Sequence, residues 1–243
     1  MKVSIITVCK NSEKTIERTI KSVLNQTYKN IEYIIIDGVS TDSTLDIISK
    51  YKDKIKLVSE RDRGIYDAMN KGIRMSKGDI IGIINSDDWY EEDAVEKIVS
   101  KYDESNGKYQ VIYGGIKVWD NDKLIKLCWN GSDNIPQENL MHPAMFVTKE
   151  LYKMLGGFSL KYKIASDYDL QLRYFNSGKV TFVPIYDMIA DFTLGGVSSQ
   201  RAKTALECNE IKYKYGSITT GTYIKRKIIF NIQKIWNDIS KRR

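Results

Sequence analysis

The first hundred residues alternate between two patterns of apolar and polar positions. Apolar residues recur at helical spacing, as at Ile16, Ile20 and Leu24, and Asn11 or Ser12 is placed to cap that helix. Short β-branched runs bounded by turn residues predict buried strands at 3–8, 31–36, 55–58 and 80–84. This alternation of strands and helices predicts an α/β fold with a mostly parallel, doubly wound sheet and helices on both faces.

The pattern loosens after residue 102. No internal repeat or low-complexity linker interrupts residues 1–220, so we predict a single domain there, with halves at 1–100 and 101–220. In the second half we expect helices at 91–102, 148–155 and 167–175, a hairpin formed by 111–119 and 124–129, and strands at 180–183 and 185–192.

The composition is that of an ordinary globular protein. Hydrophobic residues make up 42% of the 243 residues, and charged residues make up 28%. The cysteines Cys9, Cys128 and Cys208 are far apart, which favours a reducing compartment and argues against a structural zinc site. We see no secretory signal and no apolar run near the roughly 18 residues of a membrane span, so we expect a cytoplasmic location.

The segment 221–243 carries most of the net charge. It holds seven basic residues and one acid, and thus +6 of the formal net charge of +7. The rest of the chain is nearly neutral, so we do not expect a nucleic-acid binder. An apolar face and a basic face predict an amphipathic helix that lies on the inner membrane surface; the alternative is a helix packed on the domain. The apolar face is Ile224, Ile228, Ile232, Ile235 and Ile239, the basic face is Arg226, Lys227, Lys234 and Lys241, and Ile229 and Trp236 lie at the margin.

Two adjacent carboxylates follow the strand expected at 80–84. Ligands bind beyond the carboxyl ends of the strands in open α/β sheets, and Asp87 and Asp88 would lie there at an exposed strand end. Hard divalent cations prefer carboxylate oxygens, so this end is a candidate metal site. The alternative is a solvated loop that caps a helix starting near Trp89.

The other early strands also end in polar clusters. Asp37 can accept hydrogen bonds from a base or ribose, although Asp37 and Gly38 can equally form a simple turn before a helix. Nothing in the chain matches the glycine-rich dinucleotide fingerprint or the P-loop.

Four segments, in this order and spacing, resemble family 2 glycosyltransferases. The resemblance covers roughly residues 1–195 and implies the GT-A fold, with a nucleotide-sugar-binding half at 1–100 and an acceptor-binding half at 101–220. The segments are 5–8 (Ile-Ile-Thr-Val), 36–42 (Ile-Asp-Gly-Val-Ser-Thr-Asp), 64–72 (Gly-Ile-Tyr-Asp-Ala-Met-Asn-Lys-Gly) and 85–88 (Asn-Ser-Asp-Asp).

The resemblance implies roles for residues of the first half. Thr7 and Asp37 match positions that hold the nucleobase and the ribose. Arg63 and Asp67 lie where the family contacts the base or the phosphates. In the acidic motif Asn85 stands at the first position, so the resemblance places Mn²⁺ or Mg²⁺ on Asp88 and the ribose or sugar on Asp87. The division of labour between the two carboxylates stays open.

In the second half, residues 165–170 resemble the segment that supplies the general base of inverting family members. The resemblance makes Asp167 the base, whereas the alternative is that Ser166 or Asp167 only caps a helix. Asp169 is expected to be structural or to orient the acceptor. His142 lies in a segment that family members place near the diphosphate and acceptor; the alternative is a hydrogen-bonded core histidine.

These expectations combine into one function. We expect a metal-dependent inverting glycosyltransferase that moves a single sugar from a nucleoside-diphosphate sugar, UDP-linked, to a glycan or lipid-linked acceptor, as in surface polysaccharide biosynthesis. We expect it on the cytoplasmic face of the membrane, held there by 221–243. The alternatives are a sugar-phosphate nucleotidyltransferase, which would want a glycine-rich basic loop after the first strand, and an inactive nucleotide- or glycan-binding module.

Overall fold

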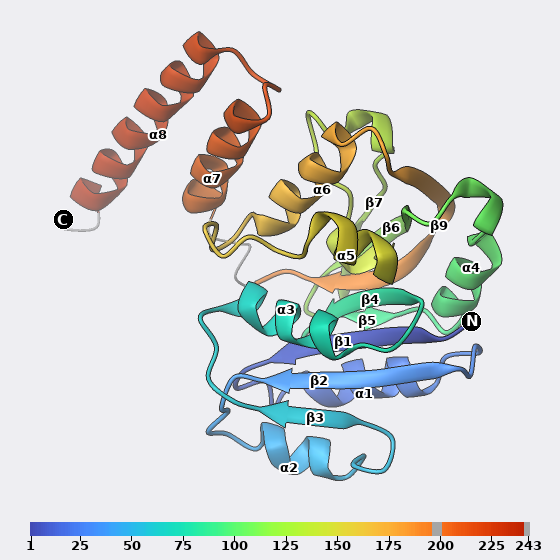
Figure 1. Cartoon of the computed structure of the whole chain (residues 1–243). Coiled ribbons are helices and arrows are strands. Elements are labelled where there is room, and N and C mark those ends of the chain that lie inside the picture. Colours follow the sequence, from blue (N-terminus) through green and yellow to red (C-terminus); the bar gives the residue numbers. More distant parts are fainter. Residues whose placement is uncertain (196–200, 241–243) are drawn as a thin grey trace.

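The structure is a computed structural model that describes residues 1–195 and 201–240, with side chains described for 1–195 and 203–230. Figure 1 shows the chain from the N-terminus in blue to the C-terminal helix in red. The first half contains β1 (Val3–Cys9), α1 (Ile16–Leu24), β2 (Ile31–Asp37), α2 (Thr44–Ser49), β3 (Lys56–Ser59), α3 (Ile65–Met75) and β4 (Ile80–Asn85).

The second half returns to the same sheet several times. It contains β5 (Trp89–Tyr90), α4 (Ala94–Lys101), β6 (Gln110–Asp120), β7 (Lys123–Cys128), β8 (Met145–Thr148), α5 (Lys149–Leu155), α6 (Ser166–Asn176), β9 (Thr181–Thr193), α7 (Arg201–Lys214) and α8 (Thr220–Ser240), with short 3₁₀ turns at Glu104–Asn106, Ser132–Asn134 and His142–Ala144.

One mixed sheet joins the two halves. Its strand order is β3-β2-β1-β4-β8-β6-β9-β5, with β7 paired to β6. The strands β3, β2, β1 and β4 are mutually parallel, whereas β8 runs antiparallel to both β4 and β6. The predicted mostly parallel α/β sheet is confirmed in the first half, and the parallel strands there place their carboxyl ends along one edge.

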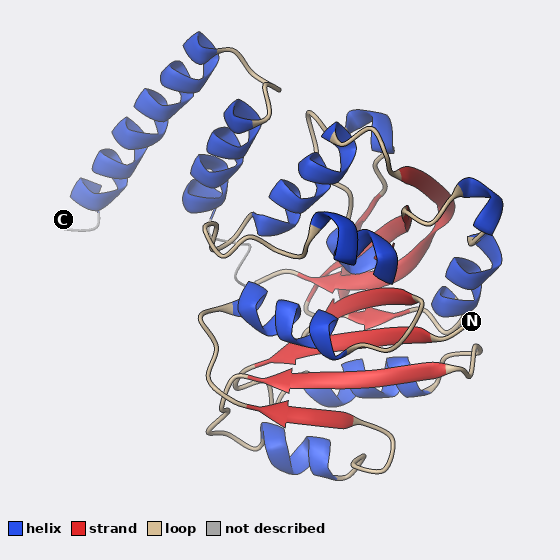
Figure 2. Ribbon diagram, in the orientation of Figure 1, coloured by secondary structure: helices blue, strands red, loops and turns tan. Residues whose placement is uncertain are grey.

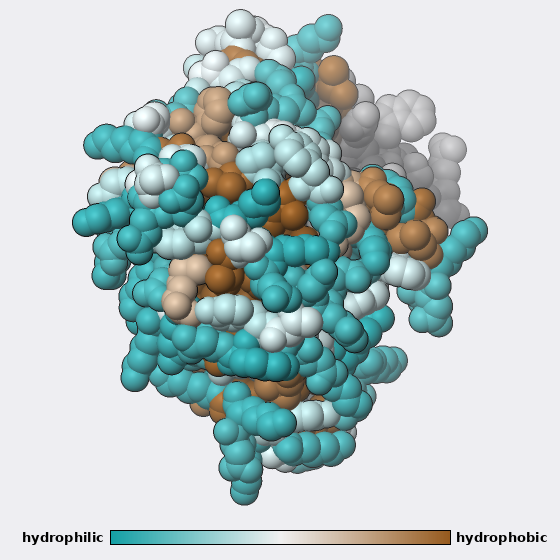
Figure 3. Space-filling model, turned by 90° about the vertical axis from the view of Figure 1, so that its right-hand side faces the viewer, coloured by the Kyte–Doolittle hydropathy of each residue, from teal (hydrophilic) through white to brown (hydrophobic). Residues whose placement is uncertain are grey.

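Helices cover both faces of this sheet, as predicted (Figure 2). One buried cluster packs α3, α5 and α6 against one face, and a second packs α1, α2 and α4 against the other. Alternate residues of β1 enter the two clusters: Ile6 and Val8 enter the first, and Val3 and Ile5 enter the second. On the face drawn in Figure 3, hydrophilic residues cover most of the surface and apolar residues show mainly in recesses between them.

One strand was not predicted, and two local predictions are wrong. The strand without a prediction is β8 at 145–148, which is too short to stand out before the helix that follows it. Residues 181–193 form one strand across Pro184 rather than two. The helix expected from residue 91 begins at Ala94, because Trp89 and Tyr90 pair with β9 as strand β5. Asp87 and Asp88 therefore precede a strand and do not cap a helix.

The segment at 220–240 is helical, as predicted, and packs beside α7. The rings of Tyr213 and Tyr223 stack with centroids 4.5 Å apart, and the Asn209 amide donates to the Tyr223 carbonyl at 3.1 Å. Within the described part of the chain, no helix combines the length and apolar character needed to cross a membrane. The predicted face positions Ile232, Lys234, Ile235, Trp236, Ile239 and Lys241 lie outside the described side chains.

Candidate active site

The loops after β1, β2 and β4 are joined at the carboxyl edge of the parallel strands. The Asn11 N–H donates to Ser40 Oγ at 2.8 Å, and Asn11 Oδ1 accepts from the Thr41 N–H at 2.8 Å. The Ser12 and Ser86 hydroxyl oxygens are 2.8 Å apart, which connects the loop after β1 to the end of β4. Asn11 and Ser12 therefore join loops and do not cap α1, whose N-cap is Thr15 without a side-chain bond. This edge is where open α/β sheets bind ligands.

Thr7 lies near the end of β1 and Asp37 ends β2, at the same edge of the sheet. Both are fully buried. Thr7 Oγ1 lies 3.0 Å from the Tyr33 hydroxyl. Asp37 accepts hydrogen bonds from the Ser40 N–H at 3.0 Å, the Ser59 hydroxyl at 2.7 Å and the Ser40 hydroxyl. Because neither side chain reaches solvent, their direct contact with a nucleobase or ribose stays a prediction.

Arg63 and Asp67 form the start of α3. Gly64, with a φ of 120°, is the N-cap. Asp67 Oδ2 accepts from the N–H of Arg63, the residue before the N-cap, at 3.0 Å, and this bond lowers the pKa of Asp67. The Arg63 side chain is 77% exposed, with its Nε 3.6 Å from Asp67. Asp67 thus shapes the loop, and Arg63 is the member of the pair able to reach an anionic ligand.

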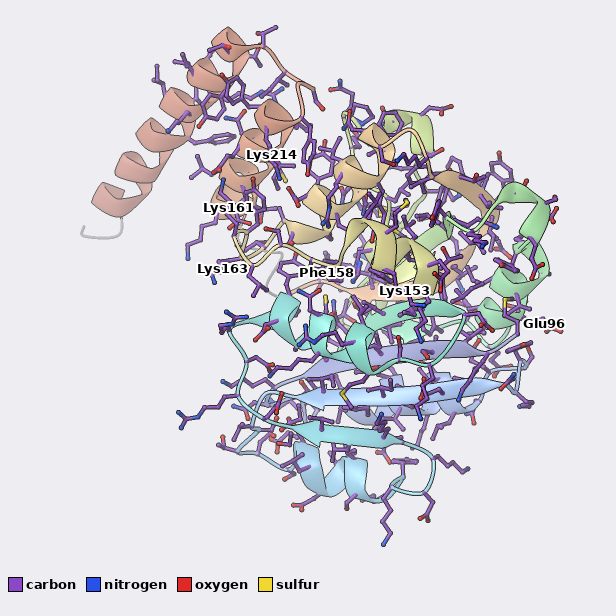
Figure 4. The ribbon with its side chains drawn as sticks, viewed as in Figure 1. Glu96, Lys153, Phe158, Lys161, Lys163 and Lys214 are labelled. Atoms are coloured by element: carbon purple, nitrogen blue, oxygen red, sulfur yellow. The ribbon has the colours of Figure 1, made fainter. Side chains whose placement is uncertain are left out.

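Helix α3 connects the two halves of the site. The Tyr66 hydroxyl donates to the Ile164 carbonyl at 2.5 Å and lies 3.2 Å from Asp167 Oδ1. The Asn70 amide donates to the Phe158 carbonyl at 2.8 Å and accepts from the Phe158 N–H at 2.9 Å. The Tyr66 and Phe158 rings stack 5.3 Å apart, and Figure 4 places Phe158 between α3 and the helices of the second half. Tyr66 and Asn70 thereby fix second-half loops on a first-half helix.

Asp87 and Asp88 meet the end of β9. The Thr193 N–H donates to Asp88 Oδ1 at 3.0 Å, and the Thr193 hydroxyl donates to the Asp87 carbonyl at 2.7 Å. The Arg18 guanidinium donates to the same carbonyl at 3.0 Å. Asp88 is 0% exposed and Asp87 is half-buried. The expectation that both lie at an exposed strand end is therefore wrong for Asp88, because β9 covers it.

The electrostatics of this pair suit a cation. Burial, together with repulsion from Asp87, raises the pKa of Asp88 well above its usual range, and burial also raises the pKa of Asp87. Asp88 Oδ2 and Asn85 Oδ1 are buried without a hydrogen-bond partner. A buried carboxylate oxygen without a donor is costly unless it is paired or coordinates a metal. These oxygens therefore fit a hard divalent cation such as Mg²⁺ or Mn²⁺.

The rest of such a coordination shell would come from outside the protein. Among the described residues, no group of three or more His, Cys, Asp or Glu side chains could hold a metal. Mg²⁺ and Mn²⁺ are commonly held by one or two carboxylates, with phosphate oxygens and waters completing the shell. The site is thus suited to a metal that arrives together with a phosphorylated ligand.

Asp167 lies in the first turn of α6. The N-cap of this helix is Ala165, which makes no side-chain cap bond, and the Ser166 hydroxyl donates to the Ser159 carbonyl at 2.7 Å. The capping alternative for Ser166 and Asp167 is therefore wrong. One Asp167 oxygen lies 3.2 Å from the Tyr66 hydroxyl, and the role of Asp167 as the base stays a prediction.

His142 lies beside this carboxylate. Its ring meets the edge of Phe158 with centroids 5.7 Å apart, and both ring nitrogens are buried without a hydrogen-bond partner. Burial lowers the pKa of His142, and the charge of Asp167 opposes that shift. His142 is therefore not a hydrogen-bonded core histidine, and the resemblance implies that it contacts the diphosphate or the acceptor. That contact stays a prediction.

The Asp169 carboxylate faces α7 and bonds to Lys214 of that helix. It is buried and accepts from Lys214 Nζ at 2.8 Å and from the Tyr215 hydroxyl at 3.3 Å. The bonds to Asp169 and Tyr215, opposed by partial burial, raise the pKa of Lys214 to about 12. Of the two roles expected for Asp169, this ion pair supports the structural one.

Two site residues were missed by sequence reasoning. Tyr66 lies inside the segment 64–72 that carries the family resemblance, so its place in that segment was the available signal. Arg18 stacks on Trp89 with its Cζ 3.6 Å from the ring centroid and reaches the Asp87 carbonyl. Arg18 is an ordinary surface position in the helical pattern, so nothing in the sequence distinguishes it.

Two curated proteins are similar to this chain in sequence. The PGL/p-HBAD biosynthesis glycosyltransferase of Mycobacterium tuberculosis is 26% identical over 206 residues, which cover 81% of this chain and 78% of that protein. Chondroitin synthase of Escherichia coli is 26% identical over 258 residues, which cover 98% of this chain and 37% of that protein.

Solved structures share the fold. S. aureus TarS in complex with UDP-GlcNAc has a TM-score of 0.69 at 18% identity, over 87% of this chain and 66% of that one. The mannosyltransferase PcManGT from Pyrobaculum calidifontis, in complex with GDP-Man and Mn²⁺, has a TM-score of 0.68 at 17% identity, over 90% of this chain and 65% of that one. This chain thus spans about two thirds of their length, and the likeness shows the GT-A fold alone. Residues 4–154, more than half of the chain, match Glycosyl transferase family 2, so the chain belongs to that family and is a glycosyltransferase.

Proposed function

We propose that this glycosyltransferase moves a single sugar from a UDP-sugar to a glycan or lipid-linked saccharide, with inversion at the anomeric carbon and with a divalent cation. The observation that supports this most is the Tyr66 contact, which brings Asp167 of the second half to the helix that follows the predicted donor loops. TarS is described with UDP-GlcNAc and PcManGT with GDP-Man and Mn²⁺, which supports a nucleotide-sugar donor.

The residues have separate roles in this reaction. Asp88 would hold the cation, which stabilises negative charge on the leaving diphosphate, and Asp87 would contact the ribose or sugar. Arg63 would contact a phosphate, since its side chain is exposed beside the same edge. Asp167 would take the proton from the acceptor hydroxyl as that oxygen attacks the anomeric carbon from the opposite side. His142, neutral because burial lowers its pKa, would hydrogen-bond the acceptor or the diphosphate.

Membership of family 2 supports glycosyl transfer over nucleotidyl transfer. The acceptor class is supported by what the relatives are named for. The mycobacterial relative is named for PGL/p-HBAD biosynthesis, and the E. coli relative is named as a chondroitin synthase. We therefore propose that 1–220 act as one unit, with the donor held by 1–100 and the acceptor by 101–220.

A donor panel tests this function. The protein is incubated with UDP-glucose, UDP-galactose, UDP-GlcNAc, UDP-GalNAc and GDP-mannose, each with Mn²⁺, Mg²⁺ or EDTA. One UDP-sugar should raise Tm in the presence of metal, because a ligand that binds only the folded state stabilises it. The same sugar should be hydrolysed slowly, with release of UDP. Stabilisation without any hydrolysis or transfer would favour the inactive binding module, and no response to any donor would contradict the proposal.

The C-terminal helix supports a place at the membrane surface. The described part of α8 exposes Ile224, Ile228 and Ile229. Lys225, Arg226 and Lys227 are exposed on the same stretch. Basic residues near an anionic lipid surface are attractive by about 1 kcal/mol each, and exposed isoleucines add apolar burial in the interface.

Replacing Lys225, Arg226 and Lys227 together with glutamine should weaken binding to phosphatidylglycerol vesicles by about tenfold or more at low salt. Salt should weaken binding of the unchanged protein, because it screens surface charge. Deletion of 224–243 should abolish binding and keep the Tyr213–Tyr223 stack in place. Vesicle co-sedimentation measures the binding of the unchanged protein, the triple variant and the deletion variant at low and high salt. Full-length protein that ignores anionic vesicles at low salt would show that α8 serves only to pack on the domain.

A further inference from the structure

Helix α7 contacts the segment that leads into Asp167. The Glu207 carboxylate accepts three backbone hydrogen bonds from this segment. Glu207 Oε1 accepts from the Lys163 N–H at 2.9 Å, and Oε2 accepts from the Ile164 N–H at 2.8 Å and the Ala165 N–H at 2.9 Å. Figure 4 shows Lys161 and Lys163 beside one end of α7 and Lys214 farther along that helix.

These three N–H groups stand just before the first turn of α6, where a helix cannot supply partners of its own. Bonds from an N–H to a carboxylate are stronger than neutral ones. The N-cap residue Ala165 has no side chain able to accept, so no local side chain fixes this helix start. Glu207 instead holds the segment that leads into the helix, from more than 40 residues away in the sequence.

The same segment is held from its other side by α3. The Tyr66 hydroxyl donates to the Ile164 carbonyl at 2.5 Å, while Glu207 accepts from the N–H of the same residue. Asp167 lies two residues beyond Ala165, and its Oδ1 is 3.2 Å from the Tyr66 hydroxyl. Ile164 is thus fixed between two helices, and the position of the Asp167 carboxylate follows from that of the segment.

Helix α7 is itself anchored to α6. The buried Asp169 carboxylate accepts from Lys214 Nζ at 2.8 Å, and Ile211 is a buried member of the cluster that contains α6. Glu207 is therefore carried on a helix that cannot shift without breaking the ion pair between Lys214 and the buried Asp169.

We propose that Glu207 is the positioning residue of the general base: it holds 163–165 so that the Asp167 carboxylate stays at the acceptor hydroxyl. This rests on the role proposed above for Asp167. A misplacement of about 1 Å at a reacting group can cost about 100-fold in rate, so the bonds from α7 act on catalysis without touching substrate. Glu207 and the rest of helix α7 lie outside residues 4–154, the part of the chain that matches the family.

Hydrogen exchange tests the structural half of this proposal without any substrate. In Glu207→Ala, the amides of 163–165 should exchange at least tenfold faster than in the unchanged protein, because they lose their acceptor. In Glu207→Gln at least one of these amides should do so, because the amide nitrogen that replaces one carboxylate oxygen cannot accept a hydrogen bond. Glu210→Ala is the matched control, since Glu210 is on the same helix and forms an exposed ion pair with Lys161. That control should leave the exchange rates of these amides unchanged. Equal exchange in all four proteins would overturn the proposal.

A double-mutant cycle tests the catalytic half. The rate of UDP release is measured for the donor selected by the panel, with water as acceptor, in the unchanged protein, Glu207→Gln, Asp167→Asn and the double variant. Glu207→Gln should lower kcat about tenfold or more with the donor Kd unchanged, because the amide nitrogen that replaces one carboxylate oxygen cannot accept a hydrogen bond from 163–165. In the Asp167→Asn background the same substitution should change kcat less than twofold, because Glu207 acts through Asp167.

The outcomes separate the two claims. An equal loss from Glu207→Gln in both backgrounds would mean general damage to the fold and would overturn the positioning role. An unchanged rate in Asp167→Asn alone would instead overturn the proposed base, whatever Glu207 does. If Glu207→Ala fails to fold, Glu207→Gln carries both tests, because it keeps the side-chain volume. Glu210→Ala should retain full activity throughout.

Discussion

Replacing Asp167 with asparagine should lower kcat by roughly 10²- to 10⁴-fold, the usual contribution of a positioned acid or base. The acceptor hydroxyl has to lose its proton as it attacks the anomeric carbon, and an amide cannot take that proton. The Tyr66 hydroxyl can still donate to the new amide oxygen, and the cap of α6 does not depend on Asp167, so Tm should change little.

The measurement is a comparison of kcat, donor Kd and Tm for the two proteins. Donor Kd should hardly change, because Asp87, Asp88 and Arg63 are untouched. Ser166→Ala is the control at the same helix start: it removes the bond to the Ser159 carbonyl and keeps the carboxylate. That control should lower Tm while kcat falls less than about tenfold. Loss of donor binding in Asp167→Asn would make the residue structural, and a product with retained anomeric configuration would contradict the inverting mechanism.

Replacing Asp88 with asparagine should abolish metal-dependent donor binding and lower kcat by about 10²-fold or more, the loss expected when a metal no longer stabilises the leaving diphosphate. The substitution keeps the acceptor for the Thr193 N–H and replaces the unpartnered Oδ2 with an amide nitrogen. The fold should therefore survive the change. Mn²⁺ with the selected UDP-sugar should raise Tm of the unchanged protein and should not change Tm of Asp88→Asn.

The same substitution should alter the pH dependence of stability in EDTA. Burial raises the folded-state pKa of Asp88 above its unfolded value. Such a group stabilises the fold at acid pH, and this stabilisation is lost as pH rises through the folded pKa. Tm of the metal-free protein should therefore fall toward alkaline pH more steeply than Tm of Asp88→Asn. If Tm of the two proteins changes with pH in the same way, burial does not raise the pKa of Asp88.

Two further variants locate the metal. Asp191→Asn is the control, because Asp191 is another buried carboxylate with an unpartnered oxygen, and its pKa is raised by burial to about 7. It should keep the response to Mn²⁺. Asp87→Asn should weaken donor binding and retain that response, if Asp87 contacts the ribose or sugar. A metal response lost in Asp87→Asn and kept in Asp88→Asn would exchange the roles of the two residues.

Much of the fold follows from local sequence. The buried strands β1, β2 and β4 are β-branched runs bounded by turn residues, and α1 and α3 repeat their apolar residues at helical spacing, so periodicity alone locates them. Short or irregular elements lack that signal. Strand β8 has four residues, and its pairing with β4 and β6 depends on partners far away in the sequence.

By itself the sequence determined the alternation of strands and helices, the family and the short motifs that name Asp88 and Asp167. Only the tertiary structure decided what each of those side chains contacts. Asp88 is covered by β9, which begins more than 90 residues later, and the segment before Asp167 is held by Glu207 on α7. Burial and hydrogen-bond partners are properties of residues that meet in space, so a local pattern predicts an element and leaves its contacts undetermined.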